Sequence, residues 1–316
     1  MQNNLDHTHA GAPADESHNE LERAVIAFAR HASTEISPHD ERLLDELTSL
    51  LPAGMPIYVA HTPKASLDEV VRVAIRVQSL GFTASPHIVA RRLRSEEELR
   101  AALARLREHG IAQVLLVAGD LHHPVGPFSS TLELIATGAL EAAGLERIGV
   151  AGHPEGHPAV GAGELLAALR AKQEFAARTG IAVHIVTQFG FNPQAICAWD
   201  RRLTQEGIRL PVHVGLAGPA SLARLLKFAM LCGIGTSMSA LVRNVGAVAN
   251  LTGHAAGPDE MLLGLLRGCA GDPGSRLVQP HVYSFGGVLA TAAWLRSIMH
   301  GAFDLAPNGR KLILHS

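Results

Sequence analysis

Polar side chains stand at the ends of several short runs of β-branched and apolar residues, and this placement constrains the fold more than any other feature of the chain. The side chains concerned are acids, bases and an amide: Glu35, His87, Asp120, His153, Glu155 and Gln188. In an eight-fold β/α barrel, the loops at the carboxyl ends of the strands converge on one mouth, and the active site is built there. The pattern therefore predicts a barrel enzyme.

Strand-like apolar runs alternate with amphipathic helical runs along the chain, which is typical of parallel βα units. Strands are predicted at residues 33–37, 56–60, 83–87, 113–118, 147–151, 182–188, 211–215 and 277–284. Helices are predicted at residues 66–79, 95–109, 129–143, 163–179, 193–206 and 220–232, and residues 237–271 carry two further helical patterns without a strand. We expect a single β8α8 (TIM) barrel domain over residues 21–316, with extra helices before the last strand and a mobile N-terminal tail over residues 1–20.

Composition favours small-molecule partners. A chain of 316 residues is long enough for one barrel of about 250 residues with extensions. The net charge of −2 and the scattered lysines and arginines predict neither nucleic acid nor an anionic membrane as a partner. Charge interrupts every long apolar stretch, and the N-terminus lacks the pattern of a secretory signal. Three cysteines far apart in the sequence, Cys197, Cys232 and Cys269, argue against a disulfide framework, so we expect a cytoplasmic protein.

Familiar nucleotide and metal motifs are missing from the sequence. It contains no GxGxxG after a strand and no GxxxxGK[ST], so any dinucleotide must bind in another way. His184 and His213 lie within strand runs, where they could face either the barrel interior or the helices. No spacing of histidines or cysteines predicts a metal site.

Nine short segments, in this order and spacing, resemble the methylenetetrahydrofolate reductase family. They are TEIS, SPHI, VAGD, GPFSSTLELI, IGVAGHPEGHP, LRAKQEFAARTG, IVTQFGFN, GLAGPASLARLLKFA and VYSF. The resemblance covers about residues 33–298, and its most specific pieces are the GVAGHPEGHP turn and the TQF strand end. It implies FAD in the barrel mouth, a folate substrate and NAD(P)H that take turns at the flavin, and a homo-oligomer.

Two carboxylates are the candidate catalytic residues. Opening a bridged folate one-carbon unit requires an acid poised near neutrality, and Glu35 is the candidate because a partly dry pocket raises a carboxyl pKa. The alternative is that Glu35 caps the helix that follows. Asp120 ends the most apolar strand, where a carboxylate is unfavourable without a task or a partner. The resemblance places Asp120 beside the flavin pyrimidine, and the alternative is a turn cap before His122.

The remaining site residues follow from the resemblance. It implies that Gln188 holds folate and nicotinamide in turn, with Leu222 and Tyr283 as further substrate contacts. It implies flavin contacts from His61, Thr62, His87, Gly119, Asp120, Phe128, Ser129, Ser130, His153, Glu155, His157 and Lys172. Lys172 would otherwise be interpreted as a solvated helix lysine, and at the second strand Ala60 could take the contact in place of His61 or Thr62.

The chain also departs from the family pattern. Residues 36–39 replace two aromatics and two prolines after the acid, Ala118 stands for an arginine, Leu222 for an aromatic, and Gly286 and Gly287 for Asn-Arg. These changes favour a divergent member, with methyl-folate oxidation as a possible direction. Two alternatives stay open: a folate-binding or methyltransferase-partner barrel without redox activity, and a metal-dependent barrel hydrolase.

Overall fold

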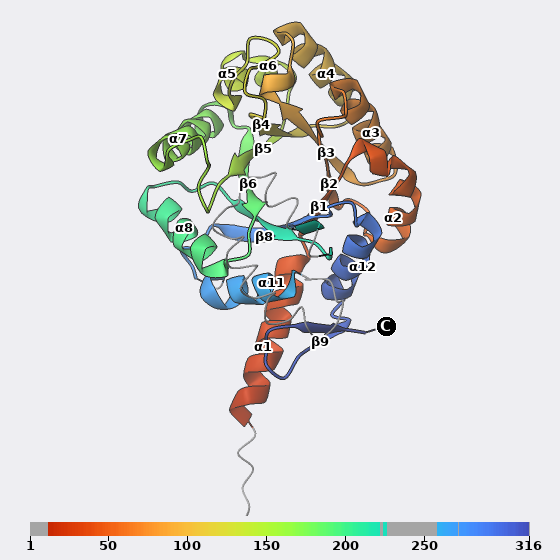
Figure 1. Ribbon diagram of the computed structural model, residues 1–316, viewed down its shortest axis with the longest axis vertical. Coiled ribbons are helices and arrows are strands. Elements are labelled where there is room, and N and C mark those ends of the chain that lie inside the picture. The colour runs from red at the N-terminus through yellow and green to blue at the C-terminus, as the bar shows by residue number, and fades with distance from the viewer. Residues whose placement is uncertain (1–11, 222–223, 226–257, 271, 316) are drawn as a thin grey trace, which may run out of the picture.

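A closed barrel of eight parallel strands in sequential order forms the centre of the computed structural model, which describes residues 12–221, 224–225, 258–270 and 272–315 (Figure 1). The strands are β1 (Ser33–Ile36), β2 (Pro56–Val59), β3 (Thr83–Val89), β4 (Gln113–Val117), β5 (Arg147–Gly152), β6 (Ala182–Phe189), β7 (Val212–Ala217) and β8 (Leu277–Tyr283). β8 pairs with β1 and closes the barrel. The predicted TIM barrel is confirmed, and each predicted strand agrees with an observed one to within two residues at either end.

Helices surround the barrel and fill most of the strand connections. They are α1 (Ala12–Ala29), α2 (Leu44–Leu50), α3 (Leu67–Ser79), α4 (Glu96–Glu108), α5 (Thr131–Ala136), α6 (Ala139–Ala142), α7 (Ala162–Thr179), α8 (Pro193–Gln205), α11 (Asp259–Leu265) and α12 (Val288–Met299), with short helical turns η1 (Pro38–Leu43), η2 (Ala90–Arg92) and η3 (Leu266–Ala270). The predicted helix at 129–143 is divided into α5 and α6, because Gly138 adopts a left-handed conformation with φ of 68° between them. The antiparallel pair β9 (Phe303–Leu305) and β10 (Leu312–Leu314) was not predicted.

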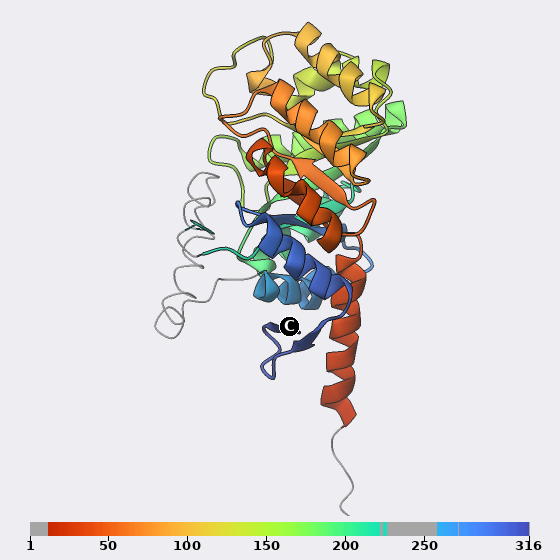
Figure 2. The ribbon, with the colours of Figure 1, turned by 90° about the vertical axis from the view of Figure 1, so that its right-hand side faces the viewer.

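The N-terminal helix corrects the predicted tail. Helix α1 begins at Ala12, inside the stretch 1–20 that the sequence predicts as a mobile tail, and it extends away from the barrel (Figure 2). Its second half packs against α12 and β8, and it buries Val25, Phe28 and Ala29. The low hydropathy at the start of the chain therefore gave no sign of this helix, and residues 1–11 of the predicted tail lie outside the described residues.

The main hydrophobic core lies between the strands and the helices, because the outward faces of the strands are apolar and side chains alternate along a strand. It includes Ile57, Val114, Ile148, Val214 and Val282, all fully buried. The interior of the barrel differs from the branched aliphatic layers that usually fill such barrels. Its one small apolar cluster, made by Tyr58, Leu115, Val117 and Val186 among the described residues, is surrounded by serines and histidines.

The connection from β7 to β8 carries the predicted extra helices. Helix α11 and the π-helical turn η3 are its described part, and the predicted helix at 220–232 falls almost entirely outside the described residues. A disulfide joins Cys197 of α8 to Cys269 of η3, so the expectation of no disulfide is wrong. The two cysteines are 72 residues apart in sequence, but packing of α8 against η3 brings them together. Cys232 lies outside the described residues.

No helix among the described residues is long and apolar enough to cross a membrane.

Candidate active site

The carboxyl ends of the strands bring Glu35 together with two histidines. Glu35 is the next-to-last residue of β1, and its Oε2 lies 3.9 Å from Nε2 of His87 on β3 and 3.9 Å from Nε2 of His281 on β8. The Glu35 side chain is 17% exposed, so it still reaches the barrel mouth. The other ring nitrogen of His281, Nδ1, shares a 2.8 Å hydrogen bond with Oγ of Ser33, two residues before Glu35, and this bond holds the ring in place.

Burial disfavours the charged forms of all three groups. Desolvation raises the pKa of Glu35, and this effect outweighs the attraction of His87, which lowers it. Desolvation also lowers the pKa of His87 to about 4 and that of His281 to about 3. Neutral imidazoles cannot hold Glu35 in its ionised form, so its pKa stays raised toward the range that an acid catalyst needs.

The alternative role of Glu35 as a helix cap does not hold. The turn η1 is capped by Ser37, whose backbone N and Oγ both donate to Oδ2 of Asp40, at 2.9 and 2.7 Å. Ser37 and Asp40 together therefore form the N-terminal cap of η1. The carboxyl of Glu35 takes no part in it and lies near His87 and His281 instead.

The interior below Glu35 is a network of neutral polar rings. The hydroxyl of Tyr58 lies 2.8 Å from Nε2 of His184, and the ring of His184 stacks on that of His213 with centroids 4.1 Å apart. His184 and His213 thus face the barrel interior, which the sequence left open. Burial lowers the pKa of His213 to about 3 and that of His184 well below its usual value. Among the described residues, no group of His, Cys, Asp or Glu side chains could hold a metal ion.

Asp120 follows β4 and pairs with an arginine that the sequence analysis did not single out. Nη2 of Arg92 donates to Oδ1 of Asp120 at 2.9 Å. Partial desolvation acts to raise the pKa of Asp120, but the hydrogen bond from Arg92, together with one from its own backbone, lowers it below the usual value. Arg92 stands in the turn η2, directly after β3. Its place as a cation at the end of a strand was the feature of the sequence that could have marked it as a site residue.

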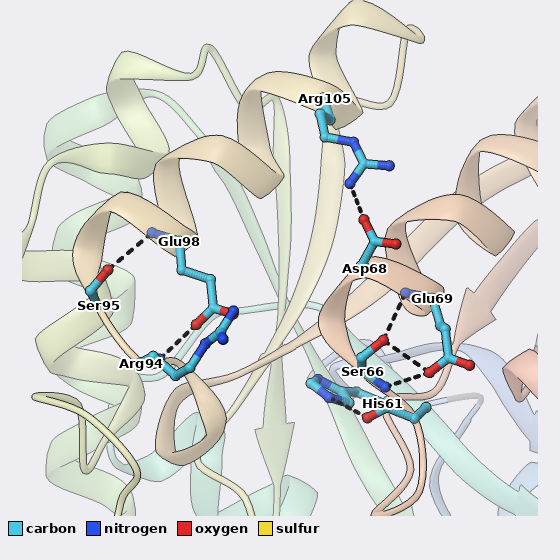
Figure 3. A network of polar contacts seen from close by, with 9 residues as sticks. His61, Ser66, Asp68, Glu69, Arg94, Ser95, Glu98 and Arg105 are labelled. Atoms are coloured by element: carbon cyan, nitrogen blue, oxygen red, sulfur yellow. Dashed lines mark hydrogen bonds and ion pairs between the residues drawn. The ribbon is translucent and has the colours of Figure 1, made fainter.

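Loop residues after β2 lie beside Arg92. Nη1 of Arg92 donates to the carbonyl of Thr62 at 2.7 Å. His61 lies next to the first turn of α3 (Figure 3), with Nε2 3.1 Å from the carbonyl of Ala65. Burial and the charge of Arg92 lower the pKa of His61, so the ring is neutral, Nε2 donates to Ala65 and Nδ1 is left as an acceptor. Both Nδ1 of His61 and Oγ1 of Thr62 are buried without a hydrogen-bond partner.

The loop between β4 and α5 brings backbone close to the mouth. Gly119 has φ of 97°, and a Cβ there would stand 2.5 Å from Cγ1 of Val89, so only glycine fits. Phe128 is buried, whereas the two predicted serine contacts serve the start of α5. Ser130 is its N-cap, and Oγ of Ser129 donates to Oε1 of Glu133 at 2.8 Å.

The loop between β5 and α7 forms a second group. His153 packs edge to face on His157 with ring centroids 5.1 Å apart, and burial lowers the pKa of His153 to about 4. Lys172 of α7 is 7% exposed rather than solvated, and desolvation lowers its pKa to about 8. Glu155 lines the same pocket as Gln188, together with Pro154, Gly156, Phe189, Gly190 and Ile196.

The substrate side of the mouth is described in part. Gln188 lies near the end of β6, and the hydroxyl of Tyr283 at the end of β8 donates to the carbonyl of Thr187 at 2.7 Å. Oγ1 of Thr187 in turn accepts a hydrogen bond from the backbone N–H of Gly215 on β7 at 2.8 Å. These two hydrogen bonds join the neighbouring strands β6, β7 and β8. Leu222 lies outside the described residues.

Fold and site together define an α/β-barrel protein with a buried acid and neutral polar groups at the carboxyl ends of its strands. The model of the methylenetetrahydrofolate reductase family matches residues 37–246, more than half of the chain, and the chain belongs to this family. It is therefore a folate-related barrel enzyme. Glu35 and Tyr283 lie outside the matched range.

Solved structures with a similar fold are distant in sequence. Dihydropteroate synthase from Thermus thermophilus is 17% identical, with a TM-score of 0.44 over 84% of this chain and 90% of that one. A putative phosphonomutase from Burkholderia cenocepacia is 12% identical, with a TM-score of 0.46 over 90% of this chain and 99% of that one.

Proposed function

We propose that this chain is a flavin-dependent oxidoreductase that interconverts 5,10-methylenetetrahydrofolate and 5-methyltetrahydrofolate, with FAD as cofactor and NAD(P)H as the partner of the other half-reaction. The observation that carries the proposal is Glu35, a carboxyl with a raised pKa between two neutral imidazoles at the mouth of a barrel of this family. The resemblance in sequence adds a homo-oligomer, and the departures from the family pattern add methyl-folate oxidation as the working direction.

Glu35 performs the proton transfer in this proposal. A bridged one-carbon unit opens to an iminium when the departing ring nitrogen gains a proton, and the carboxyl of Glu35 donates it. In the opposite direction the Glu35 carboxylate takes the proton back. Asp120 supplies a negative charge that stabilises the iminium, and Gln188 offers amide donors and acceptors to the folate ring.

Several residues at the mouth fit FAD. Lys172 is a buried cation, which suits a phosphate group, and desolvation by burial lowers its pKa. Gly119 lets backbone approach a flat ring, and the unpartnered atoms of His61 and Thr62 offer an acceptor and a hydroxyl. Bound FAD would supply the hydride chemistry that links the two half-reactions. We propose His87, Phe128, Ser129, Ser130, His153, Glu155 and His157 as the remaining contacts.

An absorption spectrum tests the proposal in one cuvette. The purified protein should bind FAD, bleach when NAD(P)H is added without oxygen, and show a second flavin response with methyl-folate. Saturating FAD should also raise the melting temperature, since a ligand that binds only the folded state stabilises it. A protein that gives neither fluorescence quenching of FAD nor a thermal shift would refute the proposal, and folate binding without bleaching would indicate a non-redox barrel.

A further inference from the structure

Arg92 is the one guanidinium that ties the loops after β2, β3 and β4 to each other in the described part of the chain. It stands in η2, directly after β3, and donates to the carbonyl of Thr62 after β2 and to the carboxylate of Asp120 after β4. The Arg92 side chain is only 12% exposed, whereas that of Asp120 is 68% exposed. The arginine is therefore the fixed partner, and the carboxylate is presented at the mouth.

The backbone around Arg92 is fixed independently of its side chain. The N–H of Arg91 donates to the carbonyl of Ala118 at 3.0 Å, and the N–H of Val125 donates to the carbonyl of Arg91 at 2.9 Å. Gly126 packs directly over the end of the same turn, since a Cβ there would stand 2.4 Å from the carbonyl oxygens of Leu93 and Arg94. These contacts hold the loop that carries Asp120 against the turn that carries Arg92.

Three polar atoms of this group are buried without a hydrogen-bond partner. Nε of Arg92 is buried without a hydrogen-bond partner, as are Nδ1 of His61 and Oγ1 of Thr62 in the adjoining loop. A buried donor or acceptor without a partner is unfavourable, so such atoms are normally paired in native structures. One such atom in the guanidinium and two in the adjoining loop are consistent with a site that a polar ligand completes.

We propose that Arg92 is a positioning residue that orients Asp120 and compensates its charge, so that the site favours the reduced, anionic form of a flavin at this edge of the mouth. This rests on the proposed function, because it places the flavin beside Asp120. An unpaired carboxylate would repel an anionic ring. A carboxylate held in an ion pair still accepts hydrogen bonds, but it repels an anionic ring less than an unpaired carboxylate does. Arg92 thereby favours transfer of electrons from methyl-folate to the cofactor.

The test compares the wild type with Arg92→Met and with Arg91→Met as a matched control. Arg91 stands in the same turn, but within the described residues its side-chain donations go to the carbonyls of Ser129 and Leu121, so its loss perturbs the loop without removing the ion pair of Arg92 with Asp120. In Arg92→Met, the ratio of affinities for reduced and oxidised FAD should fall, because the loss of a positive charge disfavours the anionic ring. A fall of about tenfold would lower the midpoint potential of a two-electron couple by about 30 mV. Arg91→Met should leave the potential unchanged.

Two further measurements separate this inference from the proposed function. Carboxyl NMR titration of the protein without FAD should show a higher Asp120 pKa in Arg92→Met than in the wild type, and Arg92→Lys should restore most of the difference. If the wild type binds no FAD, the proposed function fails and the NMR result stands alone. If FAD binds and the potential is the same in the wild type and Arg92→Met, the charge compensation is refuted. An unaltered Asp120 pKa in Arg92→Met would refute the ion pair itself.

Discussion

Replacing Glu35 by glutamine tests proton transfer while the shape of the side chain is kept. The amide keeps the shape of the side chain and can still contact His87 and His281, but it has no proton to give. The folate half-reaction should slow by about 10²–10⁴-fold, the usual contribution of a positioned acid. Reduction of bound FAD by NAD(P)H does not use this proton, so its rate should stay within about threefold of the wild type, well below the effect of a lost acid.

The structure also fixes the effect of this change on stability. Because burial raises the Glu35 pKa above its ordinary value of 4.5, the folded protein holds the proton more tightly than the unfolded chain. Stability from this group is fully present below pH 4.5 and is lost as the pH rises through the folded pKa. The loss is about 1.4 kcal/mol for each unit by which the pKa is raised. Glu35→Gln should therefore gain stability relative to the wild type at pH 8 but not at pH 4.

Stopped-flow absorbance at the flavin band measures the two half-reactions separately. In the wild type, reduction of methylene-folate should fall as the pH rises through the Glu35 pKa, and oxidation of methyl-folate should rise over the same range. Both dependences should disappear in Glu35→Gln. The matched control is Glu41→Gln, a carboxylate in η1 whose partner is the exposed Arg72. A folate half-reaction that kept its rate and its pH profile in Glu35→Gln would refute the assignment of the acid.

Three other outcomes follow from the structure. Asp120→Asn should raise the flavin midpoint potential, measured by reductive titration, and slow the folate half-reaction, measured by stopped flow. An unchanged potential with both half-reaction rates intact would leave Asp120 only a structural role in its loop. Reduction of the Cys197–Cys269 disulfide should lower the free energy of unfolding by about 2–4 kcal/mol in denaturant titrations, whereas Cys197→Ser, which keeps Cys232, should not respond to reductant. The buried His213 and His281, with pKa values near 3, should remove stability as the pH falls below about 6.5, by about 1.4 kcal/mol per pH unit for each histidine, and His213→Phe should flatten that slope in unfolding titrations.

Strand order and strand bounds could be predicted from the sequence because strand-like runs alternate with amphipathic helical runs and several of them end near a polar residue. Helix α1 could not, because its anchoring residues, Val25, Phe28 and Ala29, depend on contacts with α12 and β8 at the far end of the chain. The disulfide was missed for a related reason. Sequence separation says nothing about two cysteines that meet through helix packing, as Cys197 and Cys269 do.

The site shows the same division. Glu35, Asp120 and His87 were singled out in the sequence because each is a polar side chain at the end of an apolar run, but the partners His281 and Arg92 were not. His281 stands two residues before Tyr283 and so on the same face of β8, which was an available signal. For Arg92, the sequence gave no signal beyond its position after a strand. A surface arginine and an arginine that joins two loops look alike in sequence, and only the packing of η2 against the loop after β4 distinguishes them.

One physical cause links the unusual interior of this barrel to its acid. Inward-facing positions that commonly hold branched aliphatic residues here hold Ser33, Tyr58, His184, His213 and His281. Desolvation keeps these histidines neutral, and the same desolvation raises the Glu35 pKa. A single protonated imidazole beside Glu35 would stabilise the carboxylate and lower its pKa, so that a smaller fraction of Glu35 would hold its proton near neutrality. The uncharged interior therefore supports proton donation, and protonation of its histidines would lower both the stability of the fold and the Glu35 pKa.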